Sequence, residues 1–213
     1  MTALASAILS LLGCSHGGND ATSQRTKTDG TNPGSLTIGA LTFVLPPTWR
    51  PVTHDRLAAL SQEFEQGSKN LYERYNRGVP NPSRKLDLAA YSGADGATFT
   101  VFILDVPPQA DLIGDLKREL PQKAKWAVEQ GIIKSQSEVH TVTHDGVDGF
   151  FTDSVDGRGT HMFSGALAQP TRSNEVYLVT LSNATGDDAA VFQGLMDSVR
   201  LTAVPNSQST IPK

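Results

Sequence analysis

Two Asp-Gly pairs, at 145–146 and 156–157, separate three runs that are rich in β-branched and aromatic residues. Asp-Gly is a preferred pair for tight hairpin turns, because both residues tolerate a positive φ. The three runs are therefore predicted to be consecutive antiparallel strands. They cover residues 137–144, 149–155 and 160–169.

Further strands are predicted on both sides of this meander. The segment 35–52 indicates two short strands around Gly39-Ala40, ended by Pro46-Pro47, which cannot continue a ladder. Residues 86–108 indicate a hairpin whose second strand runs from Thr98 to Val106. The segment 175–182, EVYLVTLS, is apolar on both sides, as expected for a central strand.

Three segments have helical character. Residues 53–78 carry apolar side chains at helical spacing, with Thr53 as the predicted N-cap. Residues 110–131 are helical in composition, but Pro121 is expected to kink this helix or begin a new one. The last helix, 187–199, begins with two aspartates suited to its positive end, Asp187 and Asp188. Its apolar face is predicted to contain Ala189, Phe192, Leu195, Met196 and Val199.

Strand meanders with helices between and after them predict an α+β fold. The sheet is expected to be mostly antiparallel, with helices on both faces, because the later strands carry apolar residues on both sides. The predicted organisation is a signal peptide at 1–13, a lipidated cysteine and flexible tether at 14–35, a single domain at 36–203 and a disordered tail at 204–213.

The apolar N-terminal run ends at Cys14, the only cysteine in the chain. The run is about a dozen residues long, whereas a membrane-spanning helix needs roughly 20. The tetrad Leu11-Leu12-Gly13-Cys14 resembles the bacterial lipobox, in which the cysteine thiol receives a diacylglyceryl group before cleavage on its N-terminal side. Two acyl chains give stable anchoring.

One feature of the N-terminal segment weakens the lipobox interpretation, and the stretch that follows Cys14 supports it. No lysine or arginine precedes the apolar run, and the segment is short for its class, so the start codon could lie upstream. The stretch 15–35 is polar and small, as expected for a tether. The alternative is a buried first helix that ends in an inert cysteine.

The charge and motif content argues against several functional classes. Eighteen basic residues against 22 acidic ones give a net charge of −4, with no basic cluster, so a nucleic-acid partner is not expected. One cysteine permits neither an internal disulfide nor a cysteine-based zinc site. The chain has no Gly-x-Ser-x-Gly elbow, phosphate loop or His-Glu-x-x-His motif, and no cofactor is expected.

Three histidines occur in the meander. If both Asp-Gly turns close loops with an even number of residues, one face holds a set of five residues and His161 lies on the other face with Phe150 and Phe163. That set is His140, His144, Phe151, Asp153 and Met162. A three-histidine metal site is therefore not expected, and His140 with Asp153 is the only defensible catalytic pair.

Four aspartates in the same region suggest calcium, but their spacing lacks the alternating acids and the final glutamate of an EF-hand loop. Turn formation explains them better. They are Asp145, Asp148, Asp153 and Asp156. Elsewhere, the carboxylate pair Glu63/Glu65 is interpreted as a solvated helix surface, and Tyr72 and Tyr75 as a half-buried helix edge.

The segment LTFVLPPTW, with Phe43, Pro46 and Trp49, resembles the opening hairpin of PsbP-like domains. The segment 175–201 is similar to their ending: a central strand, a helix and a short strand that contains arginine. With the lipobox, the chain resembles the actinobacterial LpqN/LpqT lipoproteins. The resemblance implies an α/β/α sandwich and an envelope lipoprotein that binds proteins or lipid-like ligands, and it brings no catalytic residues.

The resulting functional expectation is a lipid-anchored binding or accessory module on the extracytoplasmic face of the cell membrane. Its partners would be the membrane, through Cys14, and an envelope protein or a lipid-like ligand. Two alternatives stay open. One is a small envelope hydrolase without a recognisable motif, and the other is a structural subunit of an envelope complex.

Overall fold

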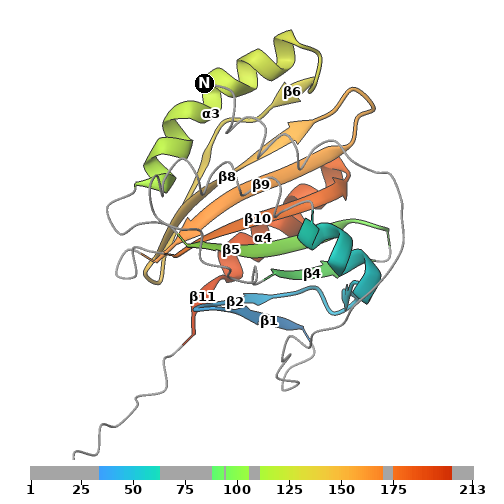
Figure 1. Cartoon of the computed structure of the whole chain (residues 1–213), viewed down its shortest axis with the longest axis vertical. Helices are drawn as coiled ribbons and strands as arrows, with labels where there is room; N and C mark the ends of the chain where they lie inside the picture. The colour runs from blue at the N-terminus through green and yellow to red at the C-terminus, as the bar shows by residue number, and fades with distance from the viewer. Residues whose placement is uncertain (1–33, 63–87, 94, 106–110, 170–174, 203–213) are drawn as a thin grey trace, which may run out of the picture.

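The computed structural model describes residues 34–62, 88–93, 95–105, 111–169 and 175–202. Within these residues, two antiparallel sheets and their helices form three layers (Figure 1). The middle layer is a large sheet of eight strands, with β7 paired beside β8 at one end. In spatial order its strands are β3 (Arg50–Pro51), β4 (Leu88–Ser92), β5 (Thr98–Asp105), β10 (Glu175–Ala184), β9 (His161–Ala168), β8 (Val147–Val155) and β6 (Ser135–Gln136), with β7 (His140–His144) off this path.

A second sheet of three strands covers part of one face of the large sheet. It consists of β1 (Ser35–Ile38), β2 (Leu41–Val44) and β11 (Arg200–Leu201). Tyr177 on the central strand β10 attaches this sheet, because the Ala40 N–H donates to the Tyr177 hydroxyl at 2.8 Å. Gly39, at φ 56°, lets the β1–β2 turn pass close over the Tyr177 ring.

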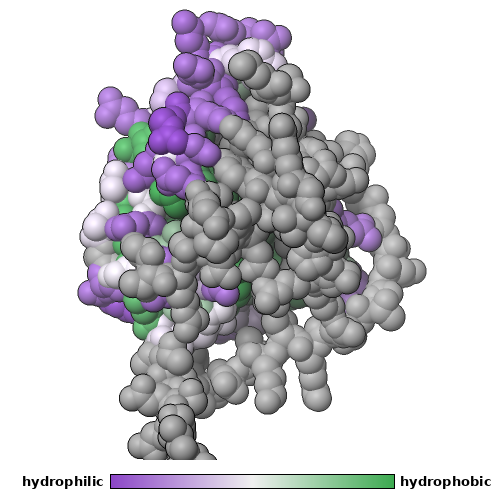
Figure 2. All heavy atoms as spheres, turned by 60° about the vertical axis from the view of Figure 1, so that its left-hand side comes forward, coloured by the Kyte–Doolittle hydropathy of each residue, from purple (hydrophilic) through white to green (hydrophobic). Residues whose placement is uncertain are grey.

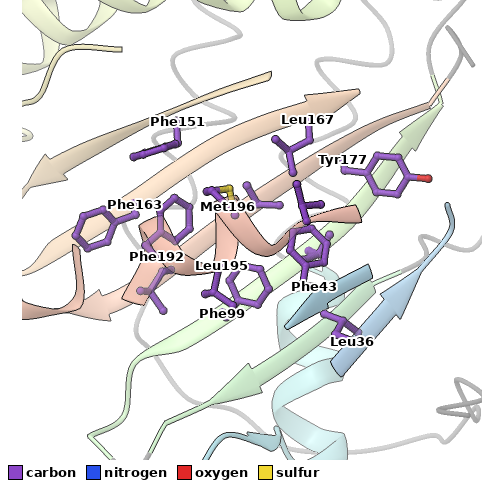
Figure 3. Close-up of a cluster of buried hydrophobic side chains, with 14 of the residues drawn as sticks. Leu36, Phe43, Phe99, Phe151, Phe163, Leu167, Tyr177, Phe192, Leu195 and Met196 are labelled. Carbon is purple, nitrogen blue, oxygen red and sulfur yellow. The ribbon is translucent and has the colours of Figure 1, made fainter. Parts of the chain in front are cut away.

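The same face is packed by the C-terminal helix α4 (Ala189–Ser198), which follows the short 3-10 helix η1 (Gly186–Asp188). Phe192 lies at the centre of this layer, with ring centroids of Phe151 and Phe163 at 5.4 and 5.3 Å (Figure 3). Asp188 accepts the Thr185 N–H at 2.7 Å and so caps the first turn. Of the predicted apolar face of this helix, only Ala189 is wrong, because its side chain is exposed.

The opposite face of the large sheet is covered by α3 (Leu112–Glu129) and by a helical segment at 54–62. Leu112, Leu116 and Leu120 of α3 pack on this face together with Leu60 of the helical segment. Thr53 caps that segment as predicted, since its hydroxyl accepts the Arg56 N–H at 3.4 Å. Pro121 lies inside one continuous helix, so the predicted alternative in which a new helix begins there is wrong.

The α+β prediction with helices on both faces is confirmed, as is the central place of β10 between β5 and β9. The β4–β5 hairpin and the Gly39-Ala40 turn are also confirmed. The predicted strand 137–144 is shorter than expected. Three residues lie between Gln136 and His140, whereas only two lie between their partners Ser154 and Phe151, so one extra residue interrupts the edge.

Candidate functional site

Asp153 and His161 form a side-chain pair on the face of the large sheet that α4 covers. The Nδ1 atom of His161 lies 2.8 and 3.0 Å from the two carboxylate oxygens of Asp153. The side chains are 22% and 25% exposed, so the pair is accessible to solvent on one side. A carboxylate at Nδ1 favours the tautomer with the proton on that nitrogen, which leaves Nε2 as the acceptor in the neutral ring.

Phe163 and Gly186 lie beside the His161 ring. The imidazole stacks on Phe163 with centroids 5.9 Å apart. Gly186 lies on its Nε2 side, where a Cβ atom would be 3.5 Å from that nitrogen. The backbone N–H of Asp153 donates to the Ser137 hydroxyl at 2.9 Å, which fixes the carboxylate-bearing residue on its strand. The arrangement is that of a general base oriented by a carboxylate.

The predicted partner of Asp153 was wrong. The β7–β8 turn has two residues, Asp145 and Gly146, both with positive φ, as expected. The β8–β9 loop, however, has five residues between Val155 and His161, and an odd number shifts the register by one. His161 therefore shares the face of Asp153, and Met162 occupies the other. His140 instead stacks on Phe151, with centroids 4.8 Å apart.

Of the other aspartates of this region, Asp145 and Asp156 lie in turns, as the sequence predicted, whereas Asp148 lies within β8, so the turn prediction is wrong for it. Asp156 Oδ1 accepts the backbone N–H groups of Arg158 and Thr160 at 2.8 and 2.9 Å. Asp145 Oδ2 lies 2.8 Å from Arg200 Nε and thereby connects the β7–β8 turn to β11. Within the ranges that the structure describes, no three histidine, cysteine or acidic side chains are grouped so that they could hold a metal ion.

A second polar cluster lies on the opposite face of the sheet, the one that α3 covers. It is a row of four hydroxyl side chains, one from each of four adjacent strands, which we call the hydroxyl row. In register across the sheet, Thr100 pairs with Thr180, Thr180 with Ser164, and Ser164 with Thr152. All four side chains are buried, between 1% and 9% exposed.

The Ser164 hydroxyl makes this row different from the other buried polar side chains. Among the side-chain nitrogen and oxygen atoms that the structure describes as buried, only Ser164 Oγ has no hydrogen-bond partner. In the small sheet, by contrast, the cross-strand hydroxyls satisfy one another: Thr42 Oγ1 lies 2.9 Å from Thr37 Oγ1 and 3.1 Å from Thr202 Oγ1. A buried hydroxyl without a partner costs about 1–3 kcal/mol, so its presence in the core calls for an explanation.

Sequence reasoning missed the hydroxyl row, although a signal for it exists. Along one face of β8 and β10 the residues change midway from apolar to hydroxyl-bearing, and along the same face of β5 they change in the opposite direction. The hydroxyls come early in β5 and β9 and late in β8 and β10, which brings them to the same level of an antiparallel meander. The alternation is visible in TFTVFILD, where Thr98 and Thr100 precede Phe102 and Leu104.

Several predicted residues lie outside the described residues: the lipobox tetrad of Leu11, Leu12, Gly13 and Cys14, and also Glu63, Glu65, Tyr72 and Tyr75. Among the helices that the structure describes, none has the length and apolar character needed to cross a membrane.

No family model and no curated protein matches the chain. Among solved structures, it is similar to the solution structure of cyanobacterial PsbP (CyanoP) from Synechocystis sp. PCC 6803. The sequences are 12% identical, the TM-score is 0.43, and the match covers 84% of this chain and 98% of that chain. It is also similar to a mutant of protein Mog1, at 12% identity and a TM-score of 0.36, over 80% of this chain and 96% of that chain.

Proposed function

We propose that this protein is a lipid-anchored, extracytoplasmic binding module of the cell envelope, similar to the LpqN/LpqT lipoproteins, and that it binds a lipid-like ligand or an envelope protein. The observation that carries the binding role is the hydroxyl row, because a buried hydroxyl without a partner offers a hydrogen bond to a bound molecule. The lipobox-like tetrad before a polar stretch supports the anchor.

The anchor is tested by labelling cells with radioactive palmitate. The wild-type chain is expected to carry the label, and Cys14→Ser is expected to carry none, because the thiol is the attachment point. Ser15→Ala is the matched control and should label as the wild type does. Equal labelling of the wild type and Cys14→Ser, or no labelling of either, would remove the lipoprotein assignment.

The binding role is tested by purifying the tagged, anchored protein from its native envelope and identifying what is retained with it. A lipid-like molecule or an envelope protein present in near-stoichiometric amount is the expected result. If the protein emerges without any retained molecule, the binding role is wrong.

The Asp153–His161 pair supports a second candidate function, a small hydrolase. In that case water would be the attacking group, with His161 Nε2 taking its proton. Any ester hydrolysis by the purified protein should fall by about 10²–10⁴-fold in His161→Ala, in line with the usual contribution of a general base. His140→Ala is the matched control. Hydrolysis that survives both His161→Ala and Asp153→Ala would exclude this pair.

A purely structural subunit would be expected to expose a broad apolar face. Figure 2 shows, on the side of the molecule where α3 lies, hydrophobic residues scattered among hydrophilic ones. The part of this view that is drawn in colour shows no broad apolar face.

A further inference from the structure

The hydroxyl row is continuous across the centre of the large sheet. Its four members come from β5, β10, β9 and β8, which are neighbours in that order. Adjacent strands lie about 4.8 Å apart, so the row extends over roughly 14 Å from Thr100 to Thr152. A hydroxyl is both a donor and an acceptor, and such a row can therefore bind either kind of polar group.

Ser164, near the middle of the row, has the hydroxyl without a partner. Its cross-strand neighbours are Thr180 and Thr152, and hydroxyls at such positions commonly bond to one another. Because the Ser164 hydroxyl lacks such a bond, its hydrogen-bonding capacity is available in a buried position. A side chain with this property is able to contact a bound ligand.

The side chains nearest to the row on this face of the four strands are uncharged. On one side lies an apolar row, which also packs against α3, and on the other a mixture of hydroxyls and methionine. The apolar row consists of Phe102, Leu178, Ala166 and Phe150, and the mixed group consists of Thr98, Ser182, Met162 and Ser154. A ligand group here would meet hydroxyls beside hydrocarbon.

Among the described residues, a lysine of α3 lies near this face. The Lys117 Nζ of α3 lies 5.9 Å from the centroid of the Phe150 ring, over the apolar row and not over the hydroxyl row. A carboxylate placed at Ser164 would have to lose its hydration without a cation in the row itself, which is costly. The side chains of the row therefore favour an uncharged polar group over an anion.

We propose that the hydroxyl row binds the uncharged polar group of a neutral amphiphile, namely the hydroxyl and ester oxygens of an acylglycerol, with Ser164 as its central contact. This inference rests on the proposed binding function and names the ligand class for the same site. Ser164 and Thr180 hydrogen-bond to the polar group, and the adjoining apolar side chains contact the start of its acyl chain.

The test measures the binding of 1-monooleoylglycerol to the full chain carrying Cys14→Ser, by native mass spectrometry. Two probes serve as comparisons: oleate, which has the same chain and a carboxylate, and glycerol, which has no chain. The monoacylglycerol is expected to bind at least tenfold more tightly than oleate, and glycerol is expected not to bind.

Single substitutions test whether the hydroxyl row is the binding site. Ser164→Ala and Thr180→Val should each weaken monoacylglycerol binding at least tenfold, because each removes a hydroxyl with little change in shape. Ser164→Ala should keep or raise the melting temperature, since it removes a buried hydroxyl that has no partner. Ser198→Ala is the control. Its hydroxyl contacts Leu195 and Val44 on the α4 side of the sheet, and binding should be unchanged.

The outcomes separate the two proposals. Equal binding to the wild type and Ser164→Ala would overturn the site, and oleate binding as tightly as the monoacylglycerol would overturn the ligand class. If monoacylglycerol does not bind but another molecule is retained from the native envelope, the ligand class is wrong and the binding function stands. If neither binds, both proposals fail.

Discussion

Replacing Phe192 with alanine should lower the free energy of unfolding by about 3–5 kcal/mol, the usual cost of deleting a buried phenylalanine. Phe192 is fully buried between α4 and the large sheet. Its ring contacts those of Phe99, Phe151 and Phe163, at centroid distances of 6.5, 5.4 and 5.3 Å (Figure 3). Removal of the Phe192 ring leaves a cavity among side chains from several strands, and these side chains cannot all move to fill it.

Urea unfolding followed by circular dichroism measures this change. Gln193→Ala, at the neighbouring exposed position of α4, should change the stability by no more than about 0.5 kcal/mol. A Phe192→Ala protein that unfolds at the same urea concentration as the wild type would show that α4 does not pack on the sheet as described.

Gly165→Ala should destabilise the domain by about 3 kcal/mol, at the upper end of the usual cost of overpacking. Gly165 lies on β9 in the middle of the sheet. A Cβ atom there would lie 2.5 Å from the Phe150 carbonyl oxygen and 2.9 Å from the Phe151 Cβ. The carbonyl oxygen belongs to the backbone of the adjacent strand, so relief requires the strands to shift apart.

Gly194 on α4 provides a control, because its replacement with alanine is expected to raise the stability instead of lowering it. A Cβ atom at Gly194 would have no atom within 4 Å outside the helix's own backbone. Gly194→Ala should therefore stabilise the helix by up to about 1 kcal/mol, from the difference in helix propensity. Thermal unfolding of both variants gives the comparison. If Gly165→Ala matched Gly194→Ala, the close approach of β8 and β9 would be wrong.

The two candidate sites lie on opposite faces of one sheet. Asp153 and His161 point toward the α4 side, whereas Thr152 and Ser164, on the same two strands, belong to the hydroxyl row on the α3 side. Substitutions in one site therefore leave the other site's side chains in place. Loss of hydrolysis and loss of amphiphile binding can thus be measured independently in the same protein.

The PsbP-like segments noted in the sequence have structural roles. Phe43 is fully buried, with its ring centroid 5.6 Å from that of Phe99, and Trp49 packs against the same ring at 6.2 Å. The arginine after α4 begins β11, which pairs with β2. These residues hold the small sheet and α4 on the large sheet, and the polar clusters lie elsewhere.

The sequence by itself determined the elements and their class. β-branched and aromatic residues marked β5 and the meander, an apolar run on both sides marked the central β10, and the Asp145-Gly146 pair predicted a tight turn, because local chemistry controls these features. It also supplied the lipobox-like tetrad, which concerns residues outside the described domain.

Only the tertiary structure decided which side chains meet. The five-residue loop before His161 set the register of β9 and gave Asp153 a partner that a four-residue loop would have placed on the other face. The hydroxyl row likewise joins residues as far apart in sequence as Thr100 and Thr180. Strand register depends on pairing between distant segments, and propensity within a single segment does not specify it.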